Sequence, residues 1–167
     1  MKLLFSILLA GISLSFFAQD PSVELVKQGL QKSQMGKHEE ALQLYNQAIN
    51  TNPENLDAYV KRAYVNSILK NYQETIEDYN TVLEAKPDLA TVYLSRGSAY
   101  AKLEQYDKAI ADFDQAIALD KDNQEAYNNR GWAKKRKGDS EGACADWKKS
   151  KKLGNGEAKI ILKNNKC

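Results

Sequence analysis

Residues 90–123, ATVYLSRGSAYAKLEQYDKAIADFDQAIALDKDN, decide the fold because they hold two amphipathic stretches joined by a short polar turn. The side chains of one face in the first stretch are Tyr93, Gly97, Tyr100 and Leu103, and those in the second are Ile110, Phe113, Ala116 and Ile117. Their spacing is typical of α-helices that bury one side. Residues 104–107, EQYD, form the turn between them. This stretch therefore predicts a helical hairpin.

The same pattern recurs along the chain with a period of 34 residues. Five columns each keep one size class in four copies: Leu25, Tyr59, Tyr93 and Tyr127; Gly29, Ala63, Gly97 and Gly131; Ala41, Thr75, Ala109 and Ala143; Tyr45, Tyr79, Phe113 and Trp147; Ala48, Val82, Ala116 and Ser150. We expect four repeats, at residues 22–55, 56–89, 90–123 and 124–155.

Glycine and proline mark where the helices of each repeat end. Gly36 and Gly138 lie in the turn of the first and fourth copies, where a left-handed residue ends a helix at little cost. Pro53 and Pro87 follow the second helices of the first two copies. Small residues such as Gly97 let two helices approach closely. Because no hairpin buries both faces alone, neighbouring hairpins are expected to stack.

This pattern of tyrosine, glycine, alanine, a large aromatic residue, alanine and proline resembles the tetratricopeptide repeat family. The resemblance covers nearly all of residues 22–155. It implies an all-α fold, a right-handed α-solenoid of four helix-turn-helix repeats with a concave groove lined by the first helices. It also implies a non-enzymatic scaffold or adaptor that binds another protein or a peptide in that groove.

The repeat register, combined with the family's geometry, assigns candidate binding residues to the groove: Val26, Leu30, Val60, Tyr64, Ile68, Leu94, Asn128, Trp132, Lys135 and Arg136, with Ser98 and Lys102 on the same side. The groove is expected to be apolar and aromatic, with a basic C-terminal end. In the alternative interpretation, several of these residues, particularly Leu30 and Tyr64, pack between adjacent first helices. A second hypothesis for function is a binder of cell-wall glycan or another small envelope ligand, through Trp132, Asn128 and the basic end.

Formal net charge is +2, which is too small to indicate binding of nucleic acid. The charge is uneven, however. Residues 1–133 hold 13 basic and 18 acidic side chains, whereas residues 134–167 hold 11 basic and 4 acidic ones. The basic segment is either a solvated helix face or a docking patch.

No motif for catalysis is found in the sequence: there is no nucleophile elbow and no glycine-rich phosphate loop. The single histidine, His38, lies at the start of a second helix. We interpret the acidic pairs Glu39-Glu40, Glu77-Asp78 and Asp112/Asp114 as solvated faces. We predict that the protein is not an enzyme and needs neither a cofactor nor a metal ion.

One further column consists of Arg62, Arg96 and Arg130, with Gln28 in the first copy. A ligand site shared by every repeat would be unusual, so this repetition favours a structural contact between helices.

After the fourth repeat, residues 156–167 form a short amphipathic capping helix, as the end of a solenoid requires. The chain contains two cysteines, Cys144 and Cys167. Cys144 lies roughly 15 Å of helix before the turn at Gly154, and Cys167 lies roughly 18 Å after it. The two sulfur atoms therefore lie at the same level of an antiparallel pair, which predicts a disulfide. Alternatively, Cys144 is a small buried hydrophobe in the column of Leu42, Ile76 and Ile110.

Residues 1–18 are interpreted as a signal peptide. Lys2 precedes an apolar run from Leu3 to Ala18 that is too short to span a bilayer comfortably. Cleavage is expected after Ala18, with Ser15 as the competing position, and a retained N-terminal anchor as the alternative. We therefore expect an exported protein, periplasmic or secreted, that does not span the membrane after cleavage.

Overall fold

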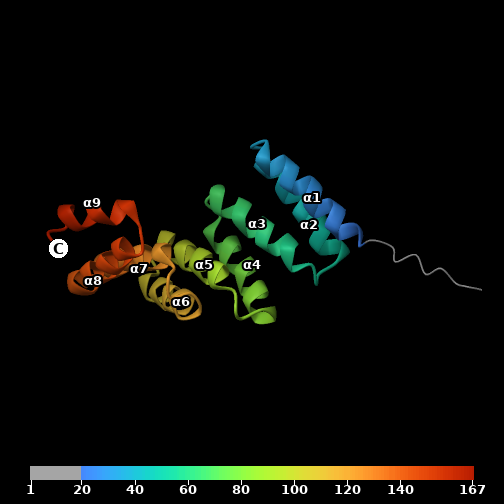
Figure 1. The fold of residues 1–167 in the computed structure, drawn as a ribbon. Helices are drawn as coiled ribbons and strands as arrows, with labels where there is room; N and C mark the ends of the chain where they lie inside the picture. The colour runs from blue at the N-terminus through green and yellow to red at the C-terminus, as the bar shows by residue number, and fades with distance from the viewer. Residues whose placement is uncertain (1–19) are drawn as a thin grey trace, which may run out of the picture.

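The computed structural model describes residues 20–167, which form nine α-helices and no strand. The helices are α1 (Pro21–Gln34), α2 (His38–Thr51), α3 (Leu56–Ile68), α4 (Tyr72–Ala85), α5 (Ala90–Lys102), α6 (Tyr106–Leu119), α7 (Gln124–Lys137), α8 (Ser140–Lys152) and α9 (Gly156–Asn164). Figure 1 shows the helix pairs following one another along the molecule from α1 to α9. The all-α repeat fold predicted from the sequence is confirmed.

Packing between helices follows the order of the chain. Each first helix packs against the second helix of its own repeat, and each second helix packs against the first helix of the next. Among the described residues, α1 also contacts α3 and α5 contacts α7, whereas no two second helices approach each other to that extent. Because neighbours in a curved array are closest on its inner side, the first helices line the inner face of the solenoid.

A large aromatic ring from the second helix fills the centre of each hairpin. Tyr45, Phe113 and Trp147 are 0–1% exposed. A Cβ atom added to Gly29, Gly97 or Gly131 would lie 2.5, 2.8 or 2.6 Å from the ring of Tyr45, Phe113 or Trp147, respectively. Burial of each ring contributes roughly 2–3 kcal/mol. The glycine column therefore gives room to a specific ring as well as allowing the helix axes to approach.

The turn inside each hairpin has one left-handed residue at the same place in the repeat. The positive φ angles are 75° at Gly36, 65° at Lys70, 59° at Glu104 and 95° at Gly138. In each copy the next residue donates its N–H to the carbonyl five residues earlier: Lys37 to Lys32, Asn71 to Asn66, Gln105 to Tyr100 and Asp139 to Lys134. This is the hydrogen bond of a Schellman motif. The left-handed conformation expected at Gly36 and Gly138 is confirmed, and non-glycine residues adopt it in the other two copies.

The C-terminal helix α9 covers the last hairpin and is linked to it covalently. Asn155 caps α9, its Oδ1 accepting hydrogen bonds from the backbone N–H groups of Glu157 and Ala158 at 3.0 and 3.2 Å. A disulfide joins Cys144 on α8 to Cys167, with 5.5 Å between the two Cα atoms. The predicted pairing is confirmed, and it fixes the end of the chain to α8.

The expected signal peptide, residues 1–18, lies outside the described residues. From residue 20 onward, no helix combines the length and apolar character needed to cross a membrane.

Candidate functional site

Two adjoining pockets on the inner face form the candidate binding groove. One, of about 390 Å³, lies between α3 and α5 and is lined by residues that include Tyr64, Leu94, Ser98 and Lys102. The other, of about 520 Å³, lies between α5 and α7 and is lined by residues that include Ser98, Lys102, Trp132 and Arg136. Because the two pockets share Ser98 and Lys102, they form one continuous feature, which we call the inner groove.

The inner groove brings together four of the ten candidate binding residues, Tyr64, Leu94, Trp132 and Arg136. Tyr64 and Trp132 are 57% and 41% exposed, so both rings are available to a ligand. Tyr64 is therefore not enclosed between adjacent first helices, as the alternative interpretation expected. Leu30 and Ile68 are 37% and 42% exposed on α1 and α3, but they line neither pocket.

Three other candidates contribute to packing. Val26 is 6% exposed and belongs to the core cluster around Tyr45, so the expectation that it faces a ligand is wrong. Val60 is half-buried against the core cluster around Tyr79. Asn128 is 8% exposed, which also contradicts a place on the open groove surface. These positions lie on the side of the first helix that meets the neighbouring repeat, so stacking of the repeats covers them.

Asn128 is unusual because it occupies the column of Val60 and Leu94 with a polar side chain. Its Oδ1 is buried and accepts no hydrogen bond from the described residues. Its main-chain carbonyl accepts the indole N–H of Trp147 at 3.2 Å. The same ring of Trp147 meets Trp132 edge-on, with 5.1 Å between the ring centroids, and thereby orients Trp132 in the groove.

The basic end of the groove is built from α5 and α7. Lys102 and Arg136 are exposed and line the pocket beside Trp132, together with one acidic residue, Glu104. Lys135, also a candidate, lines neither pocket and donates a hydrogen bond to Ser140 Oγ at 3.2 Å. The pocket beside Trp132 thus combines aromatic surface with two cations and one carboxylate, whereas Glu125 lines the other pocket. The cationic side beside Trp132 suits an apolar segment that carries a carboxylate.

Two groove residues were missed by the sequence reasoning. Tyr72 and Tyr106, the first residues of α4 and α6, line the two pockets. They share a column with His38 and Ser140. The two central copies therefore have an aromatic residue at the same helix start, and this pattern could have indicated a shared role. Their inward direction depends on how the hairpins stack, which the alignment does not contain.

The arginine column forms a ladder of ion pairs between helices. Arg62 donates to both carboxylate oxygens of Asp78, from Nε at 3.0 Å and from Nη2 at 2.6 Å. Its Nη1 donates at 2.6 Å to Asn46 Oδ1 on the second helix of the previous repeat. The equivalent partners are Asp112 and Asn80 for Arg96, and Asp146 and Asp114 for Arg130. Each arginine therefore joins two successive repeats, in agreement with the structural contact expected for this column.

The ladder corrects the interpretation of the acidic pairs. Asp78, Asp112 and Asp146 are 3–5% exposed, so these carboxylates are buried and paired, not solvated. The hydrogen bonds that Arg62 and Arg96 donate to Asp78 and Asp112 raise the pKa of both arginines. Burial opposes the charge of Arg130, but its hydrogen bonds to Asp146 and Asp114 outweigh this and raise its pKa too. The aspartates recur with the 34-residue period, so the sequence contains this column. That the aspartates pair with the arginines follows only from the contacts in the structure.

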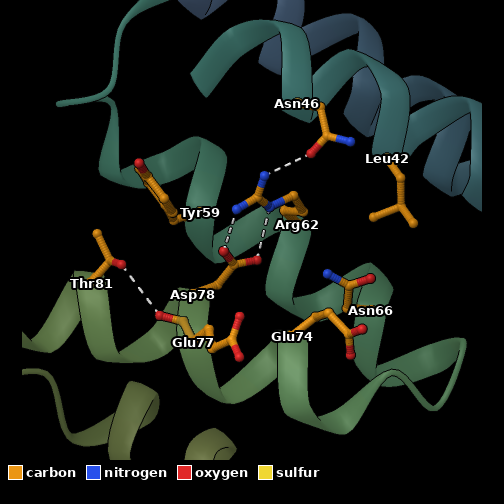
Figure 2. Close-up of a pocket in the computed structure, with 9 residues that line it drawn as sticks. All are labelled: Leu42, Asn46, Tyr59, Arg62, Asn66, Glu74, Glu77, Asp78 and Thr81. Atoms are coloured by element: carbon orange, nitrogen blue, oxygen red, sulfur yellow. Dashed lines mark hydrogen bonds and ion pairs between the residues drawn. The ribbon is translucent and has the colours of Figure 1, made fainter. Parts of the chain in front are cut away.

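A third pocket, of about 380 Å³, opens between α2, α3 and α4, beside Arg62 (Figure 2). We call it the outer pocket, and it is lined by Leu42, Asn46, Tyr59, Arg62, Asn66, Glu74, Glu77, Asp78 and Thr81. Figure 2 shows Arg62 between Asn46 and Asp78, with Glu74, Glu77 and Asn66 around the space beside Asp78.

Within residues 20–167, no group of three or more histidine, cysteine, aspartate or glutamate side chains is placed to hold a metal ion. His38 begins α2, as expected, and lines none of the three pockets described above. The inner groove offers aromatic rings, several hydroxyl groups, two cations and two carboxylates.

These features define an α-solenoid of repeated helix pairs with a groove on its inner face. A family model described as "TPR repeat" matches residues 29–67 and 97–138. A second model, described as "Tetratricopeptide repeat", matches residues 56–89. Together they cover more than half of the chain, which therefore belongs to the tetratricopeptide repeat family.

Solved structures with the same fold include MamA from Desulfovibrio magneticus RS-1, from residue 41 to its end, with a TM-score of 0.77 at 23% identity, over 81% of this chain and 76% of that one. Another crystal structure of MamA gives a TM-score of 0.77 at 21% identity, over 84% and 82% of the two chains. TTC0263, a thermophilic TPR protein of Thermus thermophilus, gives 0.66 at 19% identity, over 80% and 75%. At these identities the likeness concerns the fold alone. No curated protein matches the chain significantly.

Proposed function

We propose that the protein is an interaction scaffold that holds a segment of another protein in its inner groove. Membership of the tetratricopeptide repeat family supports a role in protein–protein interaction. The observation that carries the groove assignment is the pair of adjoining pockets between α3, α5 and α7, with Tyr64 and Trp132 exposed on either side of Ser98. Exposed aromatic rings of this kind are typical of residues that contribute strongly to binding.

The chemistry of the groove favours an apolar segment with an acidic residue nearby. The rings of Tyr64 and Trp132 offer apolar contact area at a low entropic cost of ordering. Lys102 and Arg136 lie beside them and would pair with a carboxylate of the bound segment. Because these cations are exposed, salt is expected to weaken the electrostatic part of binding.

The test is a site-specific photo-crosslink from the groove in cells that produce the protein. A photoreactive phenylalanine at Ser98 is expected to capture a protein partner, and the same group at Gln115, exposed on the second helix α6, is the matched control. The double variant Tyr64→Ala/Trp132→Ala is expected to abolish the Ser98 crosslink while leaving the helical circular dichroism unchanged. Equal capture from both positions, or capture that survives the double variant, would refute the groove as the binding site.

A second candidate function is the binding of an envelope glycan, favoured by the exposed and oriented ring of Trp132 beside Asn129 and Arg136. Sugar rings stack on such aromatic faces while amides and cations hold their hydroxyl groups. Cosedimentation with purified wall polysaccharide, lost on Trp132→Ala and retained on Tyr72→Phe, would support this function. Absence of the wild-type protein from the pellet would exclude it for the polysaccharide used.

Export to the cell envelope belongs to the same proposal. It is supported by the charged and apolar pattern of residues 1–18 and by the Cys144–Cys167 disulfide, which is typical of an oxidising compartment. Mass spectrometry of the unreduced protein from separated cell fractions tests it. Export predicts a chain that begins near residue 19, contains no free thiol and lies outside the cytoplasm. A full-length cytoplasmic chain with two free thiols would contradict it.

A further inference from the structure

The outer pocket of the second repeat has a short side chain at a position where the next two repeats have a long one. Asn66 occupies the column that holds Tyr100 in the third repeat and Lys134 in the fourth. Asn66 lines the outer pocket beside Asp78, the partner of Arg62. The other two repeats place a long side chain at this position, so comparing the three copies indicates what the second one lacks.

In the fourth repeat a lysine of the chain itself fills the equivalent place. The Lys134 ammonium lies 2.9 Å from Asp146 Oδ2, on the carboxylate that also binds Arg130. Lys134 is only 23% exposed at its side chain, so it is held against the ladder rather than extended into solvent. The ladder aspartate thus accepts an ammonium in addition to its arginine.

In the third repeat the same position is aromatic, and a lysine lies over the ring. The ring of Tyr100 lies 6.0 Å from the Arg96 guanidinium carbon, and the Lys108 ammonium lies 5.3 Å from the centre of the same ring. Both the third and the fourth repeats therefore bring a lysine of their own to this side of the ladder.

The second repeat has two carboxylates at positions where the third and fourth repeats have a cation or no charge. Glu74 occupies the column of Lys108 and Gly142, and Glu77 that of Ala111 and Ala145. Both glutamates line the outer pocket, and within residues 20–167 neither lies within ion-pair distance of a cation. Arg62 is already committed to Asp78 and Asn46. The pocket therefore carries an excess of two negative charges.

We propose that the outer pocket binds a primary alkylammonium group, which takes the place beside Asp78 that the Lys134 ammonium takes beside Asp146. Glu74 and Glu77 supply negative charge that attracts the ammonium group. The fourth repeat does not need this charge, because its ammonium belongs to the chain itself. Leu42 and Tyr59, which lie on opposite sides of Arg62 in Figure 2, supply apolar surface for the alkyl stem. The pocket volume of about 380 Å³ accommodates such a chain. An anion is disfavoured because three carboxylates face one guanidinium whose hydrogen bonds are already made.

The ammonium has two possible sources, a lysine side chain of a protein or a free small amine, and the experiment separates them. ¹⁵N-labelled protein is titrated with cadaverine and with Nα-acetyl-lysine methylamide, and the amide shifts of Asn66, Glu77 and Asp78 are followed. Saturable shifts with both probes indicate an ammonium site open to either source. Shifts with only one probe assign the site to that source. The Nε-acetylated lysine derivative is the matched control and is expected to give no saturable shift at these amides.

Variants test the assignment without relying on the inner groove. Glu74→Gln/Glu77→Gln is expected to weaken binding about tenfold, and 0.5 M salt is expected to weaken it similarly. Asn66→Lys, the arrangement of the fourth repeat, should abolish binding by supplying the ammonium internally. Asn66→Tyr, the arrangement of the third repeat, should also abolish binding. It replaces the lysine variant in the test if that variant proves less helical. Trp132→Ala should leave binding unchanged, which keeps this test separate from the proposed scaffold function.

The proposal is overturned if neither amine shifts these amides. It is also overturned if the acetylated control binds as well as the free amine, or if amine binding persists in both filled variants at wild-type affinity.

Discussion

The second and fourth repeats share one backbone and one ladder of ion pairs, yet they close the space beside that ladder differently. In the fourth, Lys134 adds an ion pair to Asp146, and a disulfide joins α8 of the same repeat to Cys167, which follows α9. In the second, Asn66 leaves a pocket of about 380 Å³ next to Asp78.

The comparison separates residues that make the repeat from residues that make a site. The ring and the small residue beneath it recur in all four repeats because they pack the two helices of a hairpin together. The arginine–aspartate pair recurs in the last three repeats, where each arginine also contacts the previous repeat. Position 66 and its equivalents lie outside that set, and the side chain there differs from repeat to repeat: Asn66, Tyr100 and Lys134. Replacements at both kinds of position distinguish the two roles.

The largest effect is expected from removing a ladder carboxylate. Asp146→Ala leaves Arg130 with one carboxylate partner and Lys134 with none, and it should cost about 3–5 kcal/mol in the free energy of unfolding. Asp78→Ala should cost less, because only Arg62 loses its partner and the pocket admits water. Urea unfolding followed by circular dichroism measures both. Asp114→Asn, at a side chain that is 52% exposed, is the control and should cost about 1 kcal/mol or less. A larger loss in the second repeat than in the fourth would contradict this account.

Reduction of the disulfide should affect only one end of the molecule. Closing a loop over a sequence separation of 23 residues stabilises by about 3 kcal/mol on the chain-entropy estimate. The Cys144→Ser/Cys167→Ser variant is therefore expected to lose hydrogen-exchange protection in α9 and α8. Protection in α3 and α4 should stay unchanged, because each repeat contacts only its neighbours. A uniform loss of protection along the chain would refute a local role.

The small residue under the aromatic ring should behave differently in the two repeats. Gly131→Ala places a Cβ 2.6 Å from the Trp147 indole, so it should cost about 1–3 kcal/mol. Ala63→Gly in the second repeat relieves no contact of that kind and should cost about 1 kcal/mol through helix propensity. Thermal melting of both variants measures the difference, and an alanine tolerated without loss at position 131 would contradict the ring-clearance argument.

The smallest effect is expected at the turn. Lys70 is left-handed, with φ at 65°, where the fourth repeat has Gly138. Lys70→Gly should stabilise by up to about 1 kcal/mol, since relief of left-handed strain exceeds the added entropy of the unfolded chain. Gly138→Ala should destabilise by a similar amount. Denaturant midpoints of the two variants measure this, and a destabilising Lys70→Gly would show that the lysine side chain holds the turn.

Most of the fold could be predicted from the sequence, because the residue pattern that specifies it is local and repeated. Four copies of one spacing identify a helical hairpin, and a hairpin with two apolar faces has to stack. The disulfide was predictable for the same reason, since helix rise alone brings Cys144 and Cys167 to one level. The candidate binding site could be predicted only in part. Tyr64, Leu94, Trp132 and Arg136 line the groove, but Val26 and Asn128 are covered by the neighbouring repeat.

What the sequence by itself determined is the period, and with it the number of hairpins, the small residues under the rings and the end cap. What only the tertiary structure decided is which side chains each hairpin covers on the next. The Arg62–Asp78 pair and the tyrosines at the starts of α4 and α6 are separated by whole helices along the chain. Their contacts depend on the distance and angle between stacked hairpins, and a one-dimensional pattern does not carry these quantities.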